Sequence, residues 1–144
     1  MKTRFYRVLQ FAKVVLATIL VDGILTGIYF SVKERAADWL IIRPLYAFAF
    51  DSWYILFFSL VLTGLSWLFP RSMGSLKGQL VTGLLIGGLA GLFLFSQFLL
   101  VYPSLSYSNL IETLLFAIVG CSCGFLHWYF ITKPVEKFSK SSGG

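Results

Sequence analysis

Charge is scarce in this sequence. Asp, Glu, Lys and Arg make up 12% of its 144 residues, whereas soluble domains carry about 25%. Hydrophobic residues account for 58% of the chain, and the mean hydropathy is +0.82. Such a composition excludes an ordinary soluble globular domain and predicts a protein that lies in a lipid bilayer.

Metal ligands are equally few. The chain has one histidine and two cysteines, namely His127, Cys121 and Cys123. A structural zinc site needs four ligands and a catalytic one usually three, and only Cys123 and His127 share a helix face. We therefore expect no metal, no cofactor, and a packing role for His127. The two cysteines point to opposite sides of one helix, which excludes a disulfide between them.

Catalytic motifs are absent as well. We find no nucleophilic triad, no phosphate-binding loop after a strand and no tandem nucleic-acid motif. Glu112 and His127 are fifteen residues apart on one expected helix, about 22 Å, which is too far for joint acid and base chemistry. These absences argue against an enzyme and against a nucleic-acid partner. A membrane enzyme acting on lipid is kept as a third interpretation.

Four long apolar runs make up most of the chain, and each is close to the roughly 20 residues that cross a bilayer. They predict an all-α fold, a bundle of four transmembrane helices in one domain, residues 14–132. The expected helices are residues 14–32, 45–69, 78–102 and 110–132.

Two basic segments flank this domain. Residues 1–13 are expected to form an interfacial N-terminus and residues 133–144 a flexible tail. The first apolar run is read as a retained helix, with a cleaved signal peptide as the alternative. Residues 33–44 form the first outer connection and could include a short interfacial helix at Trp39. Pro44 is expected to begin the second helix, because proline fits a first turn.

The basic residues are distributed unevenly between the connections. Nine of the twelve fall in the N-terminus, the middle turn and the tail, and three in the first outer connection. By the positive-inside rule, both termini lie in the cytoplasm. The expected location is therefore a multi-pass position in a membrane, the bacterial plasma (inner) membrane.

Glycines spaced by four residues recur in three of the four runs. On a helix this spacing makes a face without side chains, against which another helix can pack closely. The faces consist of Gly23 and Gly27, of Gly83, Gly87 and Gly91, and of Gly120 and Gly124. Because these faces exceed what one small bundle needs, we expect a homo-oligomer or a subunit of a larger membrane complex.

Asp22 is the most informative polar residue, since it lies near the middle of the first run. Thr18 and Thr26 lie four residues to either side, and Tyr29 follows, so the four form one polar stripe. Acidic residues at this depth are costly and usually face the bundle interior or a wet cavity. Asp22 could be a protonated group that ties helices together, a functional group on an ion, proton or ligand path, or a residue that faces lipid.

Three further polar residues fall in the outer third of the expected bundle: Asp51, Gln97 and Glu112. If they meet, they form an acidic, outward-open approach to Asp22, although Glu112 could instead cap its helix together with Asn109. This pattern favours a non-enzymatic transport or channel-type protein with an ion, proton or basic-ligand path. The alternative is an accessory, assembly or immunity-like subunit that packs through its glycine faces.

Overall fold

The computed structural model describes residues 2–101 and 107–134, with side chains described for residues 6–49, 51–93, 110–111 and 113–134. The described residues form helices and turns, without strands. Three helical segments are apolar and long enough to cross a membrane, and they become four if one bent pair of helices counts as a single span. The expected all-α class is therefore confirmed, together with three to four candidate spans.

The first helix, α1, runs from Lys2 to Glu34. At 1.5 Å per residue its 33 residues extend about 50 Å, well beyond the hydrocarbon thickness of about 30 Å. Residues 2–13 thus continue this helix, and their interfacial position stays a prediction. No proline interrupts these residues, so nothing breaks the helix. It ends where Arg35 adopts a φ of 53° and the Ala36 amide donates to the Ser31 carbonyl at 3.2 Å.

The helices after α1 form a bent pair. Helix α2 (Trp39–Tyr46) continues through a π-helical turn (Ala47–Asp51) into α3 (Ser52–Leu68), and the two halves meet at 60°. The short helix expected at Trp39 is present. Pro44 lies inside α2 and does not begin the second helix, which corrects the sequence prediction. A π-helical turn is a recognised cause of such bends.

The remaining elements form a hairpin. After the short turn helix α4 (Pro70–Met73), α5 (Leu76–Val101) and α6 (Tyr107–His127) run side by side in opposite directions, and α6 continues as a π-helical turn (Trp128–Thr132). Because α6 begins at Tyr107, Asn109 lies within the helix and is not its cap. Residues 102–106 and 135–144, which include most of the expected flexible tail, lie outside the described part of the chain.

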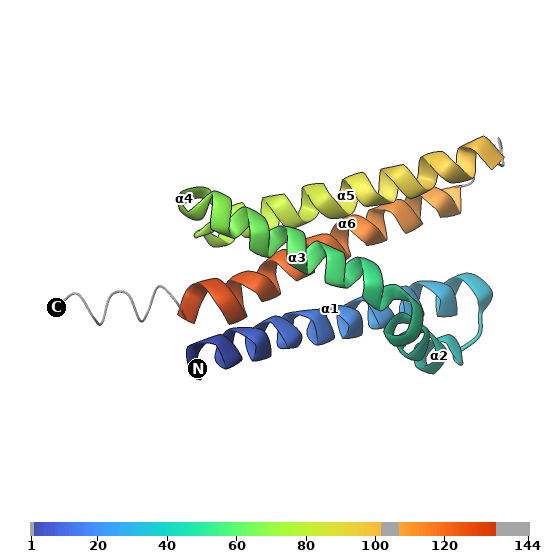
Figure 1. Ribbon diagram of the computed structural model, residues 1–144. Helices are drawn as coiled ribbons and strands as arrows, with labels where there is room; N and C mark the ends of the chain where they lie inside the picture. Colours follow the sequence, from blue (N-terminus) through green and yellow to red (C-terminus); the bar gives the residue numbers. More distant parts are fainter. Residues whose placement is uncertain (1, 102–106, 135–144) are drawn as a thin grey trace.

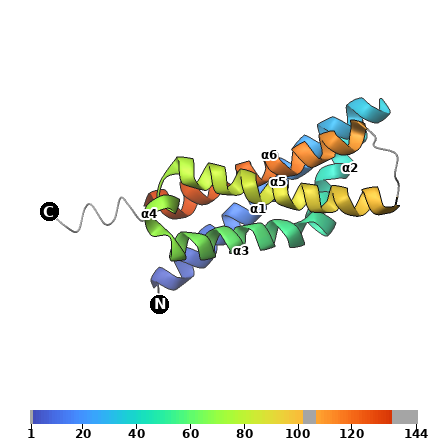
Figure 2. The ribbon, with the colours of Figure 1, turned by 90° about the horizontal axis from the view of Figure 1, so that it is seen from above.

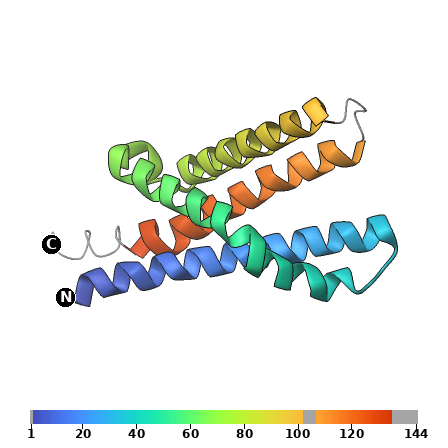
Figure 3. The same cartoon turned by 45° about the vertical axis from the view of Figure 1, so that its right-hand side comes forward.

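The helices are gathered at one end and separate at the other. The beginning of α1, the turn helix α4 and the end of the α6 extension lie at the same end of the molecule (Figure 1; Figure 2). Toward the opposite end the α5–α6 hairpin diverges from α1 and α2, with α3 crossing between them (Figure 3). The candidate site lies where α1, α2, α3 and α6 are still in contact.

The buried core is small, and most apolar side chains point outward. One cluster consists of Val14, Phe58, Leu62, Met73 and Cys123, and a second of Ile19, Ala47 and Ile55. Only 28%, 22% and 28% of the apolar windows of the three candidate spans are buried. Such extensive exposure of leucine, isoleucine and phenylalanine suits a molecule surrounded by lipid.

Candidate functional site

A pocket of about 90 Å³ lies between five helical elements. Its lining combines two carboxyl groups, a guanidinium and aromatic rings. The lining residues are Asp22, Thr26 and Phe30 of α1, Arg43 of α2, Asp51 of the π-helical turn, Tyr54 of α3, and Leu115 and Phe116 of α6. The volume suits a few water molecules or one small ion, and it is well below the roughly 300 Å³ at which pockets for drug-sized ligands begin.

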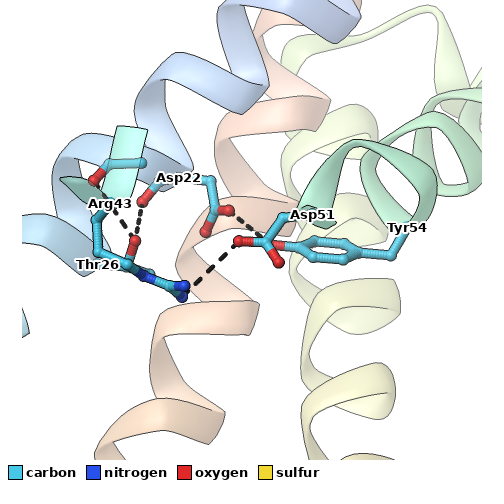
Figure 4. A network of polar contacts seen from close by, with 6 residues as sticks. Asp22, Thr26, Arg43, Asp51 and Tyr54 are labelled. Carbon is cyan, nitrogen blue, oxygen red and sulfur yellow. Dashed lines mark hydrogen bonds and ion pairs between the residues drawn. The ribbon is translucent and has the colours of Figure 1, made fainter. Parts of the chain in front are cut away.

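Asp22 is the most deeply buried acid of this site, with 2% of its surface exposed. The Tyr54 hydroxyl donates a hydrogen bond to Oδ2 of Asp22 at 2.7 Å (Figure 4). The Tyr54 ring packs against Phe116, with centroids 5.4 Å apart. Three helices therefore fix the position of one carboxyl group that would otherwise be costly inside a membrane.

Asp51 and Arg43 complete the charged part of the site. An Nη atom of Arg43 lies 3.7 Å from Oδ2 of Asp51, and the Asp51 carboxyl also interacts with that of Asp22. The guanidinium lies 5.1 Å from the ring centroid of Phe30 and 4.7 Å from that of Tyr46. Among the described atoms, Nε of Arg43 and Oδ2 of Asp51 are buried without a hydrogen-bond partner. The ion pair is therefore loose, and part of its hydrogen-bonding capacity is unused.

The polar stripe expected on α1 reaches the pocket only in part. Thr26 lines it, and its hydroxyl donates to the Asp22 carbonyl at 2.7 Å. Thr18 is fully buried one turn away from Asp22 and donates to the Val14 carbonyl at 2.8 Å. The Tyr29 ring does not line the pocket; it contacts Phe30 and the Lys33 ammonium group.

We predicted an outer approach to Asp22 formed by Asp51, Gln97 and Glu112. Of these three side chains, the structure describes that of Asp51 alone. Gln97 and Glu112 lie in α5 and α6, but their side chains fall outside the described residues. Sequence analysis did not identify Tyr54, whose hydroxyl donates to Asp22. A signal was present in the sequence, because Tyr54 follows Asp51 by three residues and so shares its helix face.

The glycine faces lie at close helix contacts. A Cβ atom on Gly83 would collide with the Gly120 carbonyl, and one on Gly87 with the Phe116 carbonyl, so α5 and α6 meet backbone to backbone. A Cβ on Gly91 would lie 2.8 Å from the Thr113 carbonyl oxygen. These glycines set the spacing within the hairpin.

The other three glycines also face helices of this chain. A Cβ on Gly23 would lie 2.6 Å from Cα of Pro44, and one on Gly27 would lie 3.0 Å from the Trp39 carbonyl oxygen. Gly124 faces the backbone of Gln79. Since these contacts are intramolecular, they give no support to an intermolecular role, and the expected homo-oligomer stays a prediction.

Comparison with known proteins finds no matching family model, no similar curated protein and no similar solved structure. The chain is therefore described by its own features. It is an all-helical protein whose three to four apolar helices, each long enough to cross a bilayer, are those of a membrane protein. Its most distinctive feature is a pocket with two carboxyl groups and one guanidinium.

Proposed function

We propose that this protein is a four-span membrane protein with both termini in the cytoplasm, and that it moves protons across the membrane by way of the pocket around Asp22. The single observation that carries this proposal is the burial of the Asp22 carboxyl beside a second carboxyl in a pocket between five helical elements. A bacterial plasma membrane remains the proposed location.

The bent pair of helices supports an even number of spans. Helix α3 has 17 residues and extends about 26 Å, close to the hydrocarbon thickness of about 30 Å, and the π-helical turn adds to it. Four spans return the chain to the side on which it started. That side carries Arg71 and Lys77 near α4 and Lys133 near the end of α6, as the positive-inside rule requires of a cytoplasmic face.

The charges of the pocket favour a single monovalent cation. Fully ionised, two carboxylates and one guanidinium leave one uncompensated negative charge, which a proton would neutralise. Among the described residues no group of three or more His, Cys, Asp or Glu side chains could hold a metal ion. A proton needs no coordination shell and fits a pocket of about 90 Å³ that holds carboxyl and phenol groups.

The test is proton flux into liposomes that contain the purified protein and a trapped pH-sensitive dye, driven by a potassium diffusion potential. Asp22→Asn should reduce the flux to that of empty liposomes. Asp38→Asn, which removes the same charge from an exposed position outside the pocket, serves as the matched control and should leave the flux unchanged. Repeating the assay with a sodium gradient and a sodium-sensitive dye distinguishes a proton from a small metal cation.

Two results would contradict the proposal: a wild-type flux no greater than that of empty liposomes, or an Asp22→Asn flux equal to that of the wild type. Either would favour the accessory, assembly or immunity-like function, in which the acids only hold helices together. In that case Asp22→Asn would be mild.

A further inference from the structure

A second polar cluster, buried at Ser59, Gln79 and His127, extends from the pocket toward the end of the molecule where α1 begins and the α6 extension ends. Ser59, Thr63 and Ser66 lie on one face of α3 at intervals of four and three residues. The Ser59 hydroxyl lies 3.4 Å from the Cys123 thiol, and the Thr63 hydroxyl lies 3.1 Å from Nε2 of His127. We use the name polar ladder for the following residues: Ser59, Thr63, Ser66, Gln79, Cys123 and His127.

Gln79 forms the last rung of the polar ladder. Its side-chain amide donates to the Ser66 hydroxyl and to the Met73 carbonyl, each at 2.8 Å. The Ser66 hydroxyl in turn donates to the Leu62 carbonyl at 2.7 Å. Met73 ends α4, so this rung lies at the turn between α3 and α5.

Two atoms of the ladder keep unused hydrogen-bonding capacity. His127 and Gln79 are both fully buried, and Nδ1 of His127 and Oε1 of Gln79 lack a partner among the described residues. The Thr63 hydroxyl donates to the Ser59 carbonyl at 2.8 Å, so it accepts from Nε2 of His127. Nδ1 is then a bare acceptor. A buried titratable ring with a free acceptor is unusual for a group that only ties helices together.

The ladder is continuous with the candidate site. Thr18, which lies one turn before Asp22, is fully buried and faces the Cys123 thiol. On α3, twelve residues separate Tyr54, which contacts Asp22, from Ser66, a distance of about 18 Å. Half of the hydrocarbon thickness is about 15 Å, so the ladder covers the depth between the pocket and one membrane face.

We propose that the polar ladder, with water between its rungs, carries protons between Asp22 and the cytoplasmic end of the bundle, and that His127 is the group that binds and releases the proton on the way. This inference rests on the proposed function and adds the inner half of the path. A proton that binds Nδ1 converts the neutral ring to imidazolium, and loss of a ring proton restores the neutral form. One proton moves, and no other bond changes.

The test uses the same liposome assay with His127→Gln. Glutamine retains an amide that can donate to Thr63, but it cannot take up and release a proton, so the flux should fall at least tenfold. Ser122→Ala is the matched control, because Ser122 lies on α6 and donates only to the Ile118 carbonyl at 3.0 Å. Its flux should equal that of the wild type. Added imidazole should restore at least part of the flux of His127→Ala.

The outcomes separate the two proposals. A His127→Gln flux within twofold of the wild type, alongside an inactive Asp22→Asn, would overturn this inference and leave the proposed function standing. An active Asp22→Asn would overturn both. Should His127→Gln not fold, as judged by gel filtration, Thr63→Val decides, because it keeps the side-chain volume and removes the hydroxyl next to Nε2. The ladder requires a reduced flux in this variant, and an unchanged flux overturns it.

Discussion

The Tyr54 hydroxyl and Oδ2 of Asp22 are 2.7 Å apart, although the two residues are separated by 32 positions and lie on different helices. This hydrogen bond joins α3 to α1 at the pocket, just beyond the π-helical turn. Through this bond the Tyr54 phenol donates a hydrogen bond to a carboxyl group that Asp51 also approaches. The bend in the second span is therefore part of the site, because it brings Asp51 and Tyr54 to the same carboxyl.

Tyr54→Phe should weaken this junction and reduce the proton flux. The hydroxyl is lost while the ring that packs on Phe116 is kept, so the expected loss of stability is about 0.6–2 kcal/mol, the range of interhelical hydrogen bonds in membranes. Denaturation in mixed SDS micelles measures the free energy of unfolding. Trp53→Phe, at an adjacent position that is 71% exposed, provides the control. Equal stability and flux in Tyr54→Phe and Trp53→Phe would mean that the hydrogen bond is unimportant.

Two adjacent glycines of α5 should respond differently to the same methyl group. In Gly87→Ala the new Cβ would collide with the Phe116 carbonyl and lie 3.0 Å from Cα of Gly120, so α5 and α6 must separate. In Gly88→Ala it would meet only the Ala117 side chain at 3.9 Å. Overpacking costs about 1–3 kcal/mol, whereas an alanine in an open helix position gains about 0.5–1 kcal/mol. The unfolding free energies of the two variants should therefore change in opposite directions.

Arg43 and Asp51 can be tested together in a double-mutant cycle. Arg43→Gln removes the positive charge that lies 3.7 Å from Asp51 and leaves two neighbouring carboxyl groups, so it should destabilise the protein. Adding Asp51→Asn to Arg43→Gln should restore part of that loss, with a coupling of about 0.5–3 kcal/mol. The measurement is the unfolding free energy of the wild type, both single variants and the double variant. Strictly additive changes would show that the ion pair contributes nothing.

The sequence predicted the helical class because its apolar runs are long and nearly free of charge. It predicted an approach from Asp51 to Asp22 because Asp51 falls in the outer third of the second run and Asp22 near the middle of the first. It also placed Gly87 and Gly120 on faces without side chains. Each of these inferences depends on composition or on a spacing within one segment, which is information that a single chain carries.

The remaining features depend on contacts between distant segments. Nothing near Pro44 in the sequence shows that α2 continues through it, since Gly23, on another helix, provides the space that Pro44 occupies. The contact between the Tyr54 hydroxyl and Asp22 depends on the π-helical turn, which the sequence analysis did not predict. Gln79 was missed because it lies next to the turn between α3 and α5, where a polar residue is expected to face water.

Gly23→Ala tests whether the contact between α1 and α2 positions the charged residues. Its Cβ would lie 2.6 Å from Cα of Pro44, a backbone atom, so α2 must move away from α1. Arg43 is adjacent to Pro44 and would move with it, which would lengthen the contact with Asp51. We expect a loss of stability of about 1–3 kcal/mol, as for other overpacked sites, together with a reduced proton flux.

Gly64→Ala is the matched control for Gly23→Ala, because no atom lies within 4 Å of a Cβ at Gly64. It adds the same methyl group to a helix of the same bundle and should leave the flux unchanged. If Gly23→Ala lowered the stability but kept the wild-type flux, the position of Arg43 would not matter for transport. Because Arg43 reaches the pocket from α2, such a result would show that proton binding in the pocket does not depend on the exact position of the guanidinium.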